Sequence, residues 1–336
     1  MKSEPDLKEG KSERVMELLY RALKGEELSA SKLADEYHVS ARSITRDIDS
    51  LKCFMADRPE MFYGTELVYS SSNHSYTLKM DTLLSDRELI SIAKLIVGCR
   101  VFSKDDLVII LAKLEAITSP ADRAKMKELL NKEILHYKEP GSDCQSVIDN
   151  IWKLTECINN RYLISVYYHR MDRSTVDRRL MPVSIMFSES YFYLIAYRCD
   201  KETGNLSRPL YYRIDRISSI TVHRQKYDLE PSLRFDEGEL RNRSQFMWPG
   251  PDRHIRFEFT GPSVQAILDR LPTAKIISCL RRGGTAKYII EADTTGNGIK
   301  MFLLSQGSWV RVLEPKELRE EMQEEVRKMF EGYEGE

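Results

Sequence analysis

Residues 28–52 read LSASKLADEYHVSARSITRDIDSLK, and their pattern predicts two helices separated by a tight turn. Ser29 can cap the first helix, whose apolar side chains are Leu33, Ala34 and Tyr37. The residues His38-Val39-Ser40 then break the pattern, and Ser40 can cap the second helix. The buried stripe of the second helix is Ile44, Ile48, Leu51 and Phe54.

The open face of the second helix carries side chains that suit contact with DNA. Arginine can bind guanine edges or phosphates through two hydrogen bonds, and serine and threonine donate to phosphate oxygens. We therefore expect DNA contacts from the N-terminal half of this helix, through Ser40, Arg42, Ser43, Thr45 and Arg46.

The flanking elements extend this pattern to a winged helix-turn-helix over residues 12–80. An amphipathic helix begins near Val15, and a β-hairpin after residue 64 has a polar tip that includes Asn73 and His74, two further candidates for DNA contact. A three-helix unit with a hairpin and no role in DNA binding would have the same pattern. Residues 1–80 hold 12 basic and 14 acidic side chains, and this net charge of −2 is weak for binding DNA unless a dimer doubles the contacts.

The composition indicates a globular protein of several domains. The chain has 336 residues, of which 42% are hydrophobic and 31% charged, and its formal net charge is −1, so a nucleic-acid partner requires a local basic patch. No run of 18 apolar residues and no secretory signal is present, and the six cysteines form no C-x-x-C pair. We expect a soluble, cytoplasmic protein with no metal, cofactor or membrane partner.

The pattern Ser40-x-Arg42-x-Ile44-x-Arg46-Asp47-Ile48-x-x-Leu51 resembles the recognition helix of the DeoR-like and WYL-domain bacterial transcription regulators. The resemblance implies an N-terminal winged helix that binds double-stranded DNA. Asp47 lies within this pattern, but DNA phosphates would repel its carboxylate. We therefore expect Asp47 to contact other parts of the protein.

Residues 81–140 predict helices, because aliphatic side chains recur there at helical spacing and Ser85-Asp86-Arg87-Glu88 forms a capping box. Such a stripe indicates a core or a dimer interface rather than a cofactor site. The resemblance implies a helical linker between the DNA-binding and sensor parts that contributes to dimerisation, and we expect a homodimer.

Residues 141–228 begin with a helix and continue as short strands in which apolar and polar side chains alternate. One strand is YFYLIAY at 191–197, and many short strands of this kind predict a small β-barrel. The segment 161–226 holds 12 basic and 6 acidic residues, a net charge of +6, which predicts an anion-binding surface. Arginines can hold phosphates while tyrosines stack on bases, although arginines lying over the barrel wall and tyrosines filling its core would give the same composition.

The WYL family adds roles for particular residues. Phe192-Tyr193-Leu194 stands where the WYL domain has its Trp-Tyr-Leu signature, and the segment Tyr212-Arg213-Ile214-Asp215-Arg216-Ile217 resembles its companion motif. Phe192 replaces the family tryptophan and removes an indole N–H donor. The resemblance implies an Sm-like or SH3-like sensor barrel whose ligand contacts are Tyr168, His169, Arg178, Tyr193, Arg213 and Arg216. We expect Asp215 to orient Arg213 or Arg216 through a salt bridge.

The last part of the chain, 254–336, predicts the element order βαββαβ followed by a helix, which is typical of a ferredoxin-like unit. It resembles the C-terminal extension of many WYL regulators. The predicted fold is therefore α+β and multidomain. Its parts are a polar tail at 1–11, a winged helix-turn-helix at 12–80, a helical linker at 81–140, a WYL sensor at 141–228, a second linker at 229–253 and a ferredoxin-like α/β domain at 254–336.

These patterns favour a ligand-responsive transcription regulator that binds double-stranded DNA as a homodimer and an anionic effector, a nucleotide or short nucleic acid, at the WYL domain. An accessory protein that binds single-stranded DNA or RNA without governing a promoter is the alternative. An enzyme using His169 with Cys199 or a carboxylate is disfavoured, because no base, nucleophile and oxyanion donor occur at a recognised spacing. We expect no enzymatic activity.

Overall fold

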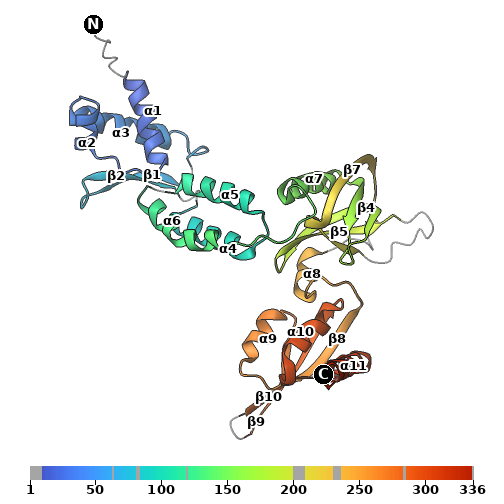
Figure 1. The fold of residues 1–336 in the computed structure, drawn as a ribbon. Coiled ribbons are helices and arrows are strands. Elements are labelled where there is room, and N and C mark those ends of the chain that lie inside the picture. Colours follow the sequence, from blue (N-terminus) through green and yellow to red (C-terminus); the bar gives the residue numbers. More distant parts are fainter. Residues whose placement is uncertain are drawn as a thin grey trace. The chain divides into compact units, whose positions relative to one another are not determined.

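The computed structural model describes residues 10–62, 64–80, 84–118, 120–199, 209–229, 236–282 and 285–334. The chain folds into two units, residues 1–140 and 141–336 (Figure 1). Both units combine helices with antiparallel strands, so the prediction of a multidomain α+β fold is confirmed. Most of the predicted polar tail at 1–11 lies outside the described residues, as do Lys201 and Arg208 of the basic segment.

The first unit begins with three helices and a hairpin that share one core. The elements are α1 (Lys11–Leu23), α2 (Ala30–Glu36), α3 (Ala41–Ala56), β1 (Thr65–Ser70) and β2 (Ser75–Met80). Leu18, Ile44 and Ile48 are fully buried at its centre. Leu28, just before α2, pairs with Tyr76 through two backbone hydrogen bonds and so joins the helices to the hairpin.

The predicted stripe of α3 is correct for Ile44, Ile48 and Leu51, but Phe54 is exposed and Met55 is buried in its place. Residues three and four positions after Leu51 both lie near the stripe, so helical spacing alone does not choose between them. Phe54 packs instead against Phe62 at the surface, where Arg58 covers its ring.

The rest of the first unit is helical, as predicted, and has its own core. Its helices are α4 (Asp86–Cys99), α5 (Lys104–Ile117) and α6 (Pro120–Leu135). Ser85 accepts a hydrogen bond from the backbone N–H of Glu88, and the Glu88 carboxylate accepts one from the backbone N–H of Ser85, which confirms the capping box. Leu107, Met126 and Leu130 are fully buried between the helices.

The second unit opens with a five-stranded antiparallel sheet. After α7 (Val147–Asn160) come β3 (Tyr162–His169), β4 (Thr175–Ser188), β5 (Tyr191–Arg198), β6 (Leu210–Arg213), the 3-10 helix η1 (Ile214–Arg216) and β7 (Ile217–Lys226). Alternate residues of β5 face opposite sides. Leu194 and Ala196 pack in the core beneath α7, whereas Tyr193 and Ile195 pack with Leu240 of α8 (Glu237–Arg243).

The prediction of a closed small barrel is not confirmed. The strands are ordered β6-β5-β4-β3-β7, and in the described part of the chain no ladder joins β6 to β7. The chain passes from the short strand β6 through the single turn of η1 into β7, so these two edges are linked in sequence without pairing. The sheet is open, and its Sm-like or SH3-like class stays a prediction.

The second sheet of this unit has four antiparallel strands in the order β11-β8-β10-β9. Its elements are β8 (Asp252–Phe259), α9 (Val264–Arg270), β9 (Lys275–Arg282), β10 (Thr285–Thr295), α10 (Gly298–Ser305), β11 (Val310–Glu314) and α11 (Lys316–Glu334). This is the predicted order of strands and helices, and the ferredoxin-like class stays a prediction. The segment predicted as a linker, 229–253, contains α8.

Candidate functional site

The N-terminal half of α3 presents two arginines that have no acidic partner. Ser40 caps the helix by accepting a hydrogen bond from the backbone N–H of Ser43 at 3.2 Å. Arg42 and Arg46 are exposed, and among the described residues no carboxylate forms an ion pair with either. Their guanidinium groups are therefore available to an anion outside the protein.

The hydroxyls on the same face of α3 are already in local hydrogen bonds. The Ser43 hydroxyl lies 2.9 Å from that of Ser40, and Thr45 donates to the backbone oxygen of Ala41 at 3.0 Å. These bonds orient both side chains along the helix. Ser40, Ser43 and Thr45 still have oxygen lone pairs or a rotatable proton for a further contact.

Asp47 has the structural role predicted for it. The side chain is 1% exposed and accepts a hydrogen bond from Nε of Arg14 at 2.7 Å, which joins α3 to α1. The carboxylate therefore faces the protein interior and does not neutralise Arg42 or Arg46, and the acidic side chain that α3 exposes is Asp49.

The hairpin tip is less available than the sequence predicts. Asn73 donates to the Glu27 carboxylate at 3.2 Å, and the same carboxylate accepts from the Ser75 hydroxyl at 2.9 Å. The His74 ring lies 3.3 Å from the Tyr69 hydroxyl, and His74 has a left-handed backbone conformation at φ 49°. Both candidates are exposed on the hairpin, but both have partners within the protein.

In the second unit, four of the six predicted ligand residues line one cavity of about 500 Å³. We call it the arginine cavity. One wall comes from the five-stranded sheet, the turn after β3 and η1, and consists of Tyr168, Arg170, Met171, Tyr193, Tyr211, Arg213 and Arg216. The opposite wall consists of Phe246, Met247, Trp248, Pro249 and Met301. No acidic residue is among the described residues that line it, so the cavity combines cationic, phenolic and apolar side chains.

Arg178, the fifth predicted residue, lines an adjoining cavity of about 200 Å³. This side cavity also contains Arg170 and Arg198, and it shares Tyr168, Arg170, Tyr211 and Pro249 with the arginine cavity. The shared walls make the two cavities neighbours. We call their arginines, Arg170, Arg178, Arg198, Arg213 and Arg216, the cationic track.

Arg213 is held in place by an acidic partner beneath it, as predicted for Asp215. Its Nε and one terminal nitrogen donate to the two Asp215 oxygens at 3.1 and 2.6 Å, and its guanidinium lies 3.3 Å from the centre of the Tyr191 ring. Burial alone would lower the pKa of Arg213, but the ion pair with Asp215 outweighs it and raises the pKa. Arg216 forms no ion pair among the described residues and is the less constrained cation.

Two of the cavity tyrosines, Tyr168 and Tyr193, are hydrogen-bond donors at neutral pH. Burial raises the pKa of Tyr168 and of Tyr193 above the ordinary phenol value, so both hydroxyls remain protonated. Tyr193 pairs with Arg213 across β5 and β6. A phosphate or carboxylate bound near Arg213 would therefore meet both a cation and O–H donors.

His169 is not brought to the arginine cavity. Its Nε2 lies 3.1 Å from the Ser218 hydroxyl and its ring packs edge-on against Tyr167 at 5.7 Å. His169 and Tyr167 alternate with Tyr168 along β3 and so face the other side of the strand. The predicted ligand role of His169 has no support in this geometry.

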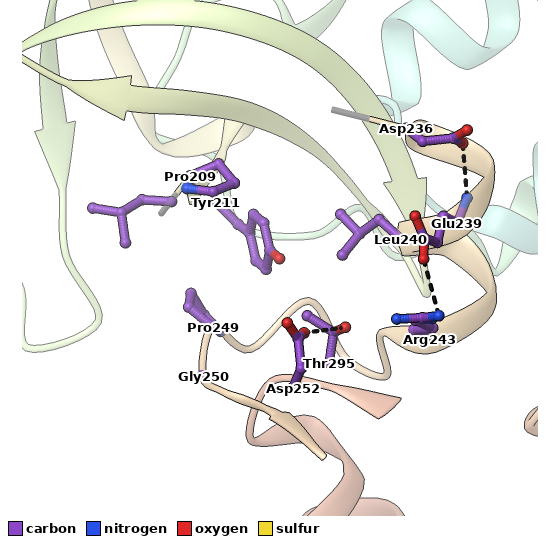
Figure 2. A pocket seen from close by; sticks show the side chains of 11 residues that line it. Pro209, Tyr211, Asp236, Glu239, Leu240, Arg243, Pro249, Gly250, Asp252 and Thr295 are labelled. Carbon is purple, nitrogen blue, oxygen red and sulfur yellow. Dashed lines mark hydrogen bonds and ion pairs between the residues drawn. The ribbon is translucent and has the colours of Figure 1, made fainter. Parts of the chain in front are cut away.

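Tyr211 and Pro249, which line both the arginine cavity and the side cavity, also line a third cavity of about 350 Å³ that contains three carboxylates (Figure 2). Asp236, Glu239 and Asp252 line this carboxylate cavity. Asp236 accepts from the backbone N–H of Glu239, Glu239 pairs with Arg243 at 2.9 Å, and Asp252 accepts from Thr295 at 2.7 Å. An anion entering this region is therefore favoured on the arginine side of Tyr211.

The sequence did not reveal the apolar wall, because its residues lie in the predicted linker and in α10. Phe246, Met247, Trp248 and Pro249 follow α8 in the chain, and Met301 is some fifty residues later. The one local signal was the Trp248-Pro249-Gly250 sequence, an aromatic residue followed by turn residues. Its position against the sheet depends on how α8 packs, which no local pattern shows.

Family models identify two domains in the second unit. The WYL domain model matches residues 149–222, and the WCX domain model matches residues 251–330. The chain contains a WYL domain followed by a WCX domain. The sheet that carries the arginine cavity thus lies in the WYL domain, Met301 lies in the WCX domain, and Phe246 to Pro249 lie between the two matches.

Two solved structures illustrate what the chain resembles. Proteasome accessory factor B/C (PafBC) of Arthrobacter aurescens is 16% identical over 93% of this chain, with a TM-score of 0.30, and this chain spans 46% of that chain's length. The crystal structure of a CRISPR Cas-related protein is 17% identical over 76% of this chain and 75% of its own, with a TM-score of 0.35. Among curated protein sequences, none matches.

Within the described ranges, no group of three or more histidine, cysteine, aspartate or glutamate side chains is placed to hold a metal ion. In the same part of the chain, no helix has the length and apolar character to cross a membrane.

Proposed function

We propose that this WYL-domain protein is a transcription regulator that binds double-stranded DNA through α3 and an anionic effector at the arginine cavity. The observation that carries the proposal is the polarity of α3. Among the described residues, Arg42 and Arg46 are exposed and have no acidic partner, while Asp47 is buried against Arg14. The N-terminal half of α3 therefore exposes two arginines that fit a phosphate backbone and guanine edges, and the exposed carboxylate of Asp49 lies one turn beyond them.

DNA binding is tested by removing the two arginines one at a time. Arg42→Ala and Arg46→Ala should each weaken binding to a duplex that the wild-type chain has selected from a random pool. A lost base contact costs about 1–3 kcal/mol and relaxes specificity at one position, whereas a lost phosphate contact weakens all duplexes alike and lowers the salt dependence. Arg327→Ala is the control, because Arg327 is exposed on α11 and pairs with Glu324 and Glu331. Unchanged affinity in both α3 variants, at matched salt, would show that α3 is not the reading helix.

The effector proposal rests on the cationic track. The cavities hold Arg170, Arg178, Arg198, Arg213 and Arg216, with the phenols of Tyr168 and Tyr193 beside them. These groups fit a phosphate-bearing molecule such as a nucleotide or a short single strand. Occupancy of the cavity would change the DNA affinity by a coupling free energy of about 1–3 kcal/mol, which corresponds to a roughly 5- to 150-fold change.

The net charge of the N-terminal residues favours a dimer. Residues 1–80 have a net charge of −2, which makes a single copy a weak DNA binder, so we propose a homodimer, which doubles the phosphate contacts.

We propose no catalytic step at the arginine cavity. The side chains there are suited to holding an anion and not to activating a nucleophile.

A further inference from the structure

The arginine cavity has a cationic wall and an apolar wall, and the apolar wall does not come from the WYL domain. Arg213 and the tyrosines belong to the five-stranded sheet, and Arg216 belongs to η1, which follows β6 within the WYL match. Trp248 and Met301, which face them, lie outside the WYL match and are 48% and 44% exposed. A purely anionic ligand would use only the first wall, so the second wall indicates a ligand that also has an apolar or aromatic part.

The backbone that carries Trp248 is fixed on the WYL side. Met247, the preceding residue, is buried in a cluster with Met186 and Ile195 of the sheet and Leu240 of α8. The segment therefore cannot swing away from the cavity without exposing Met247.

The same backbone is fixed on the WCX side by close contacts with residues 296–298. The Trp248 carbonyl accepts a hydrogen bond from the backbone N–H of Asn297 at 3.0 Å, and the Asn297 side chain donates to the Pro249 carbonyl at 3.0 Å. A Cβ atom at Gly296 would lie 2.1 Å from the Trp248 oxygen, and one at Gly298 would lie 1.7 Å from the Gln245 oxygen. Only glycine permits these approaches.

The two residues before Trp248 have unfavourable backbone conformations. Phe246 and Met247 have backbone φ angles of 54° and 46°, in the left-handed region that residues other than glycine rarely adopt. Such conformations persist where the surrounding contacts impose them, and they cluster at binding sites. A constrained backbone that nevertheless leaves a large indole half exposed at a cavity is the arrangement of a preorganised contact.

We infer that Trp248 stacks on a flat heteroaromatic ring of the effector while Arg213 and Arg216 hold its phosphate. The inference rests on the proposed effector site and specifies its ligand, which must carry both a phosphate and a base. The carboxylate cavity beyond Tyr211 and Pro249 repels a phosphate, so the phosphate is directed to the arginines and the base to Trp248. A ligand bound in this way contacts the WYL domain, the segment before the WCX domain and Met301 of the WCX domain together.

The test compares two single-stranded probes that differ only in their bases. A short oligothymidylate and an abasic oligomer with the same number of phosphates are titrated against the full chain, and binding is measured by fluorescence anisotropy. The wild type should bind the oligothymidylate about 5- to 150-fold more tightly, which corresponds to stacking of ~1–3 kcal/mol on one base. Trp248→Ala should abolish this preference and leave the abasic affinity unchanged.

Two controls separate stacking from damage to the fold. Trp152→Ala removes an exposed tryptophan of α7 that lines none of the three cavities, and it should keep the preference for bases. In a Trp152→Phe/Trp309→Phe variant, Trp248 is the remaining one of the three tryptophans, and oligothymidylate but not the abasic oligomer should quench its fluorescence.

The outcomes distinguish this inference from the proposed function. If neither probe binds, or if Arg216→Glu leaves binding of both unchanged, the proposed effector site is wrong and the inference fails with it. If both probes bind equally to the wild type, if the preference for bases survives in Trp248→Ala, or if oligothymidylate does not quench Trp248 in the Trp152→Phe/Trp309→Phe variant, the arginine site stands and the stacking role of Trp248 is refuted.

Discussion

At the scale of single residues, buried ion pairs determine which charges remain available to ligands. Asp47 and Asp215 are both nearly fully buried and each holds an arginine, Arg14 in the first unit and Arg213 in the second. Asp215 positions Arg213 at the cavity, but two of the Arg213 donors are already used in this ion pair. Arg216 has no such partner in the part of the chain that the structure describes, so its replacement removes a cation without leaving a buried carboxylate unpaired there.

Asp47→Ala tests the buried pair of the first unit. The change leaves the Arg14 guanidinium buried without its partner and should lower the free energy of unfolding by about 3–5 kcal/mol. The measurement is unfolding of the full chain by denaturant, from which the free energy of unfolding of the first unit is obtained. Asp49→Ala is the matched control, because Asp49 is exposed on the same helix and its removal should change the free energy by no more than about 0.5 kcal/mol. Equal effects in both variants would contradict the structural role of Asp47.

Tyr227 provides a test at alkaline pH. Its hydroxyl donates to the Pro182 carbonyl, and burial raises the pKa of the phenol to about 12. Because the folded-state pKa is above the value of about 10 for an unfolded chain, the stabilisation is complete below pH 10 and is lost as the pH rises towards 12. Absorbance of the phenolate should therefore show a late-titrating component that is smaller by one tyrosine in Tyr227→Phe than in the wild type. A titration curve identical to wild type would contradict the assignment.

At the scale of helices and strands, local pattern predicts most of the structure and misses what depends on packing. The cap at Ser40 and the spacing of Ile44, Ile48 and Leu51 are local, and they predict α3 correctly. The motifs around Tyr193 and Arg213 likewise place both residues at the cavity. Trp248 could not be predicted, because its contact with the sheet requires α8 to pack on Tyr193 and Ile195 and residues 296–298 to approach from the WCX domain.

Replacing Gly298 tests how residues 296–298 pack against the segment before Trp248. Gly298→Ala would force a Cβ atom to within 1.7 Å of the Gln245 carbonyl, so the segment before Trp248 must move. We expect a lower melting temperature for the second unit. We also expect the preference for oligothymidylate over the abasic probe to be smaller than in the wild type. Gly332→Ala is the control, because a Cβ atom there meets nothing within 4 Å, and in a helix it should stabilise by about 0.5–1 kcal/mol. An unaffected preference for bases in Gly298→Ala would show that the position of this segment is not important for binding.

At the scale of the whole molecule, the proposal requires two chains on one DNA duplex. The first 80 residues carry a net charge of −2, and counterion release from a few arginine contacts per chain gives only weak binding. Sedimentation at micromolar concentration should therefore show twice the monomer mass, both free and on DNA. A chain that is monomeric and yet binds its duplex tightly would contradict the homodimer.

We expect an anion at the arginine cavity to change how tightly the chain binds DNA. The direct measurement is the ratio of affinities for the selected duplex with and without saturating oligothymidylate, in the wild type and in Arg216→Glu. The wild type should show a ratio that differs from one by about 5- to 150-fold in either direction. Arg216→Glu should bring the ratio to one, because its carboxylate would repel the effector phosphate, and it should keep the contacts of Arg42 and Arg46 with DNA. A wild-type ratio of one, or an unchanged ratio in Arg216→Glu, would contradict coupling between the arginine cavity and DNA binding.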